Sequence, residues 1–239
     1  MRLFILSRAR THRATGISMT DSLFRLMSWL SPAYPVGAYA FSHGLEAAVE
    51  DGLATDTPSV LDWIATIMTS GNGYADLVFL AAAWEAEADE LASINEFALA
   101  FQGTAELRLE STAQGRAFFM VTADAWPCAA VEAMRGIAPE SIVYPVAVGA
   151  VAKSHGIDRR DTLLAYAHAF AANLVSAAVR LIPLGQTDGQ RITADLMPKC
   201  LAAVERALET PLDEVATGTP MVDVLSMQHE HQYTRLFRS

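Results

Sequence analysis

Apolar side chains recur at helical spacing along almost the whole chain, and this periodicity most constrains the possible fold. β-Branched residues rarely alternate with polar ones, so the sequence gives almost no strand signal. Apolar residues make up 52% of the 239 positions and charged residues only 18%, which calls for a large buried interior. The sequence therefore predicts an all-α fold, a single-domain bundle of about ten helices.

The apolar spacing and the residues at helix ends set the expected boundaries. Thr57 followed by Pro58 is typical of a helix start, and Gly52, Gly71 and Gly156 fit helix ends. No stretch is rich enough in Pro, Gly or Ser to separate domains, so residues 20–239 are expected to form one unit. The expected helices lie near 21–30, 42–51, 58–70, 74–88, 90–102, 104–124, 140–154, 159–181, 189–208 and 221–236.

Charge and cysteine content exclude several classes of function. The 27 acidic residues outnumber the 17 basic ones, and an acidic body repels nucleic acid and anionic lipid. Residues 1–19 are basic, but their apolar LFIL segment is too short for a signal peptide, so we interpret them as a disordered leader. Cys128 and Cys200 form no CxxC pair, which indicates core thiols in a reducing compartment. We expect a cytoplasmic protein.

One uncharged run, residues 162–179, has the minimum length of a membrane span. It is dominated by alanine and contains His168, Asn173 and Ser176. A helix buried in the bundle is therefore the preferred interpretation, and no membrane contact is expected.

Three fragments suggest catalysis or metal binding, and each has a simpler interpretation. GAVAKS at 149–154 resembles the end of a phosphate-binding loop, but Ala152 replaces its glycine. His229 and His231 stand two residues apart, so a helix would turn them to different sides, which favours a polar helix surface over a metal site. Glu110 and Gln114 share one helical face, which favours a buried polar network over acid–base chemistry. We predict no enzyme activity, cofactor or metal ligand.

A narrow polar line marks the otherwise apolar segment NLVSAAVRLIPLGQTDGQ at 173–190. Asn173, Ser176 and Arg180 follow one another at i, i+3 and i+7. An arginine on such a helix must be paired inside the protein or lie at an interface, because an unpaired buried charge is costly. Both alternatives stay open at this point.

The carboxyl-terminal sequence DVLSMQHEHQYTRLFRS combines aromatic, apolar and cationic residues close to the chain end. His229, Tyr233 and Phe237 are spaced at i, i+4 and i+8, beside Arg235 and Leu236. Such a segment can dock onto another protein or pack on its own core. The residues alone leave these two interpretations equal.

The segment SPAYPVGAYAFSHGLE at 31–46 interrupts the helices with an elaborate connection. Two prolines stiffen it, and Gly37 allows a backbone geometry that other residues resist. Ser42 can cap a helix on which Glu46 and Glu50 face outward. This arrangement activates no nucleophile but builds a rigid surface, so it favours recognition over chemistry.

Five segments together resemble the urease accessory protein UreF family, in its order and at its spacing, from about residue 20 to the end. They are SPAYPVGAYAFSHGLEAAVEDG, RLESTAQG, YPVAVGAVAKSHGI, NLVSAAVRLIPLGQTDGQ and MQHEHQYTRLFRS. The resemblance implies a non-enzymatic, all-helical, homodimeric factor that binds UreD (also called UreH), the GTPase UreG and apo-urease in GTP-dependent nickel delivery. The residues expected to contact partners are Pro35, Gly37, Tyr39, Ser42, Glu46, Arg180, Tyr233, Arg235, Leu236 and Phe237.

The alternative is a protein that handles metal itself. It would be a helical metal-dependent hydrolase or a nickel carrier that uses His229, His231 and His43. A stoichiometric ion retained after dialysis would distinguish this alternative from a scaffold.

Overall fold

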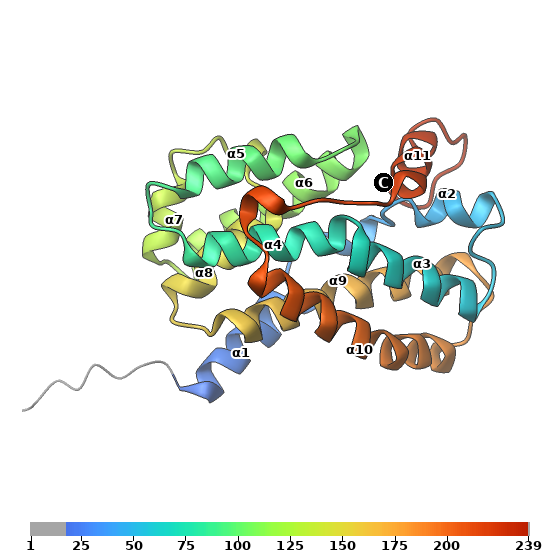
Figure 1. Ribbon diagram of the computed structural model, residues 1–239, viewed down its shortest axis with the longest axis horizontal. Helices are drawn as coiled ribbons and strands as arrows, with labels where there is room; N and C mark the ends of the chain where they lie inside the picture. The colour runs from blue at the N-terminus through green and yellow to red at the C-terminus, as the bar shows by residue number, and fades with distance from the viewer. Residues whose placement is uncertain (1–17, 239) are drawn as a thin grey trace, which may run out of the picture.

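The computed structural model describes residues 18–238, and its regular elements are all helical (Figure 1). The described part contains eleven α-helices and three short 3-10 turns, at Ala38–Ala40, Pro139–Ser141 and Leu212–Glu214. The α-helices are α1 Met19–Trp29, α2 Leu45–Glu50, α3 Thr57–Ser70, α4 Asn72–Glu85, α5 Leu91–Phe101, α6 Ala105–Ala125, α7 Ala129–Met134, α8 Tyr144–Ser154, α9 Arg159–Leu181, α10 Gln186–Glu209 and α11 Pro220–His229. The predicted all-α class is confirmed.

Local signals in the sequence explain several helix ends. The Asp56 side chain accepts the Ser59 amide at 3.0 Å, and Pro58 lies in the first turn of α3. Ser18 caps α1, which begins at Met19. The remainder of the leader expected over residues 1–19 lies outside the described residues.

The helix expected over 42–51 begins three residues late, as α2 at Leu45. His43 and Gly44 both have left-handed backbone conformations, with φ of 56° and 77°, and this prevents a helix from continuing through them. Ser42 is therefore not the residue that immediately precedes the helix, although its hydroxyl still accepts the Glu46 amide at 3.4 Å. Gly37 has a φ of 75°, as its predicted role in the turn requires.

Three further expectations about helices were inaccurate. The last helix was expected to reach residue 236, but α11 ends at His229 and an irregular segment follows. The helix expected from residue 140 starts at Tyr144, after the turn Pro139–Ser141. The short helix α7 was not predicted, because six residues are too few for a periodic pattern.

Two helices, α4 and α8, form the centre of the fold. Nearly every side chain of α4 from Asn72 to Ala81 is buried, as are all those of α8 from Pro145 to Ala152. Gly149 allows their close approach, since a Cβ there would lie 2.4 Å from the Leu80 carbonyl oxygen. The GAVAKS fragment is thus part of a buried helix, in which Gly149 serves packing.

Helix α9 contains the long uncharged run and has the length and composition of a membrane-crossing helix. Half of its most apolar window is buried inside the protein, and it packs along α10 and against α3 and α4. Figure 1 shows it behind α10 and α3. These contacts are those of a core helix, as the sequence predicted.

Candidate functional site

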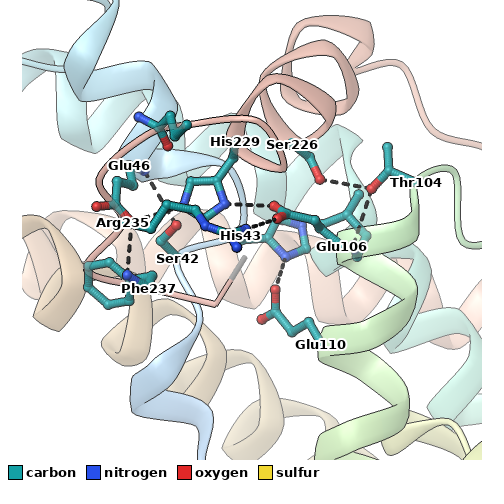
Figure 2. A network of polar contacts seen from close by, with 12 residues as sticks. Ser42, His43, Glu46, Thr104, Glu106, Glu110, Ser226, His229, Arg235 and Phe237 are labelled. Atoms are coloured by element: carbon teal, nitrogen blue, oxygen red, sulfur yellow. Dashed lines mark hydrogen bonds and ion pairs between the residues drawn. The ribbon is translucent and has the colours of Figure 1, made fainter.

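The carboxyl-terminal tail, residues 230–238, folds back onto the start of α2. Both carboxylate oxygens of Glu46 accept backbone amides of the tail, from Leu236 at 2.7 Å and from Phe237 at 2.9 Å. The Arg238 amide donates to the Ala40 carbonyl at 2.7 Å. The tail is therefore tied to the segment 31–46 through its backbone (Figure 2).

His229, a buried residue at the end of α11, contacts both α2 and α6 beneath the tail. Its Nε2 lies 2.9 Å from a Glu46 oxygen and its Nδ1 lies 2.7 Å from a Glu106 oxygen, with His229 fully buried (Figure 2). A neutral imidazole donates from only one nitrogen, so two such bonds require either an imidazolium or a protonated carboxyl. Arg235 adds a cation to the cluster, 3.1 Å from Glu106.

Glu106, on the first turn of α6, is the buried acid of this cluster. Burial raises the pKa of Glu106, and the nearby His229 and Arg235 oppose that rise. The Thr104 hydroxyl, which caps α6, lies 2.8 Å from the Ser226 hydroxyl of α11. Paired polar side chains thus hold α11 against α6.

Two predictions about exposure were wrong in this region. Glu46 was expected to face outward with Glu50, but it is only 8% exposed because the tail covers it. His229 was expected on a polar helix surface and is buried, whereas His231 is exposed. Helical spacing could not reveal either fact, because the partners that bury these residues are more than 100 positions away.

Arg180 combines both interpretations left open for the polar line on α9. Its guanidinium donates to the Tyr39 carbonyl at 2.9 Å and lies 4.4 Å from the centre of the Phe237 ring. The side chain nevertheless stays exposed. Asn173 also donates to this region, at 3.4 Å from the Phe41 carbonyl. The polar line thus contacts the segment 31–46 through Arg180 and Asn173, and it contacts the tail through Arg180.

The residues expected to contact partners divide into an exposed and a buried group. Ser42, Glu46 and Phe237 are buried and hold the arrangement together. Five others are exposed, and we name them the tail platform: Tyr39, Arg180, Tyr233, Arg235 and Leu236. Pro35 is exposed and Gly37 half-buried in the connection that leads to Tyr39. The structure thus brings segments from three parts of the chain to one surface.

A second buried polar cluster lies deeper, between α2, α4, α6 and α9. His43 Nδ1 lies 3.2 Å from Glu110, whose other oxygen lies 3.4 Å from the Gln114 amide nitrogen. This confirms the polar network predicted for Glu110 and Gln114. On α4 and α9, Tyr166 donates to Asp76 at 2.7 Å.

Ionisation in the deeper cluster is governed by burial. Burial raises the pKa of Asp76 to about 7, although the Tyr166 hydrogen bond and His43 lower it. For His43, burial lowers the pKa, but Glu110, Asp76 and Asp223 together raise it above its usual value. Sequence reasoning missed Asp76 and Glu106. A charge in an apolar run such as NGYADLVFLAAAWE was the available signal.

The residues named for a metal-handling alternative do not come together. Within the described chain, residues 18–238, no three His, Cys, Asp or Glu side chains are placed to hold an ion. Both nitrogens of His229 face carboxylates, and His43 belongs to the other cluster. The two described cysteines are free thiols, Cys128 half-buried and Cys200 buried.

Comparison with known proteins places the chain in one family. The UreF family model matches residues 54–197. The urease accessory protein UreF of Granulibacter bethesdensis is 51% identical over 222 residues, covering 91% of this chain and 94% of that protein. Those of Rhodopseudomonas palustris and of a Bradyrhizobium species are 49% and 45% identical, covering 91% and 96% of this chain and 91% and 98% of the relatives. The chain therefore belongs to the UreF family of urease accessory proteins.

Proposed function

We propose that this protein is a non-enzymatic urease maturation factor that acts in the cytoplasm as a homodimer. It joins UreD/UreH and the GTPase UreG, and so couples GTP hydrolysis to nickel insertion into apo-urease. Family membership supports the urease maturation role. The binding role is supported by the contacts that bring the segment 31–46, α9 and the tail together at the tail platform.

The tail platform has the composition of a protein-binding surface. Tyr233 is fully exposed, Tyr39 is 67% exposed and Leu236 is 61% exposed. Tyrosine and arginine are enriched among residues that dominate binding energy at protein interfaces. Glu46 holds the backbone of the tail at Leu236 and Phe237 before any partner arrives, which lowers the entropic cost of binding.

The test separates binding from folding. The double variant Tyr233→Ser/Leu236→Ser removes exposed apolar surface without touching a buried contact, so its urea unfolding midpoint should equal that of the parent. Its affinity for the cognate UreD–UreG pair should fall at least about tenfold, since exposed aromatic anchors commonly contribute more than about 1 kcal/mol. Co-elution in size-exclusion chromatography and titration calorimetry measure both quantities.

A matched control is Met197→Ser on α10, which removes a side chain of similar exposure, 62%, from another part of the surface. It should bind both partners as the parent does. Equal binding by the double variant and the parent would show that partners dock elsewhere. Steady turnover of urea or GTP by the pure chain, abolished by one substitution, would instead overturn the non-enzymatic role.

A further inference from the structure

A small chamber lies in the deeper polar cluster. It has a volume of about 20 Å³, and side chains from α4, α6 and α9 line it together with His43. Its lining is unusually polar for the interior of a helical bundle, and includes Asn72, Asp76, Ser111 and Tyr166. A water molecule needs about 10–15 Å³ of such space, so the chamber has room for one.

Three polar atoms on the chamber wall lack a hydrogen-bond partner among the described residues. They are the Nε2 of His43, the Nδ2 of Asn72 and the Oγ of Ser111. All three residues are at least nine-tenths buried, with exposures of 4%, 9% and 8%. Buried polar groups in folded proteins are almost always satisfied, by protein or by ordered water. Three such atoms around one chamber therefore point to a shared partner.

His43 is also held in an unfavourable backbone conformation. Its φ of 56° lies in the left-handed region, which non-glycine residues rarely adopt. The Nδ1 bond to Glu110 fixes one side of the ring, and His43 also lines the chamber. A partner for Nε2 would fix the second side and help to maintain this conformation.

A larger cavity of about 200 Å³ lies next to the chamber, between the segment 30–39 and α9. The two spaces share five lining residues and therefore adjoin each other: Glu110, Gln114, Tyr144, Tyr166 and Phe170. This cavity gives a route by which a small molecule can reach the chamber.

We propose that the chamber is a binding site for one ordered water molecule. The water hydrogen-bonds Ser111 Oγ and at least one of the other two atoms, His43 Nε2 and Asn72 Nδ2. It thereby bridges α6 to the segment before α2 or to α4, and it exchanges with solvent through the larger cavity. Water suits the site because it can both donate and accept hydrogen bonds. It can therefore accept from the amide nitrogen of Asn72, which can only donate.

The first test is the sign of a stability change. Ser111→Ala removes one partner of the water, and Ser176→Ala, at an exposed site within α9, measures the helix-propensity gain of the same substitution. With water bound, the Ser111→Ala chain should melt about 2–4 °C below the Ser176→Ala chain. If the chamber is dry, removal of an unpaired hydroxyl should raise the melting temperature at least as much as the control substitution.

A high-resolution crystal structure of the parent chain gives an independent answer. It should show solvent density in the chamber within about 3.2 Å of Ser111 Oγ and of at least one of the other two atoms. A chamber without density, or one in which the three atoms pair with protein groups, would overturn the proposal. This result decides the matter even if a substitution at Ser111 prevents folding.

Discussion

In the part of the chain that the structure describes, two buried histidines face carboxylates, and their surroundings differ. His229 binds carboxylates through both ring nitrogens, one on α2 and one on α6, with Arg235 close by. His43 binds one carboxylate through Nδ1, and its Nε2 has no partner among the protein residues that the structure describes. The first histidine links elements far apart in the sequence, whereas the second lines an internal chamber.

This difference separates two uses of a buried polar group. Around His229 both ring nitrogens contact buried carboxylates, so removal of the imidazole takes a partner from each of them in the interior. Around His43 only one ring nitrogen contacts a carboxylate, so the same removal takes away a single charged contact. We therefore expect the two sites to respond unequally to similar substitutions.

The largest effect is expected for His229→Leu. This change leaves Glu46 and Glu106 as buried carboxylates without the imidazole between them. Loss of one partner from a buried charge cluster costs about 3–5 kcal/mol, so the free energy of unfolding should fall by about that amount in urea titrations. His231→Leu is the control. Because His231 is exposed, its loss should change stability by less than about 0.5 kcal/mol.

A smaller effect, dependent on pH, is expected at Asp76. Its pKa is raised from 3.8 to about 7, so between these values the folded chain binds a proton that the unfolded chain has released. Stability therefore falls as pH rises through this range, by about 1.4 kcal/mol per pH unit at most. The raised pKa of His43 acts in the same direction. Its contribution to the stability of the fold is present below pH 6.5 and is lost as pH rises through the pKa of the folded chain.

Asp76→Asn removes the proton exchange but keeps an oxygen for the Tyr166 hydroxyl. Relative to the parent, this variant should gain about 2–3 kcal/mol of stability between pH 5 and pH 7, measured as urea unfolding midpoints at fixed pH values. The exposed Asp62→Asn should follow the parent at every pH. Parallel curves for Asp76→Asn and the parent would mean that Asp76 is ionised throughout.

The comparison also shows how far the sequence determines this molecule. The all-α class and the span of α9 followed from apolar spacing, which is a local property. The pairing of Glu110 with Gln114 was accessible for the same reason, because both lie on one face of α6. Burial of Glu46 was not, because it depends on a tail 190 positions away, and such contacts leave no periodic trace.

The smallest effect, and the sharpest test of the comparison, is expected for His43→Leu. The substitution loses the contact with Glu110 and places a bulky side chain at a φ of 56°. Only one carboxylate loses a partner, and Glu110 keeps Gln114. The free energy of unfolding should therefore fall by only about 1–2 kcal/mol. His43→Asn tolerates the left-handed conformation better and should lie closer to the parent. If urea unfolding showed a loss for His43→Leu as large as that for His229→Leu, the two histidines would have equivalent roles, and the distinction between a linking site and a chamber wall would be wrong.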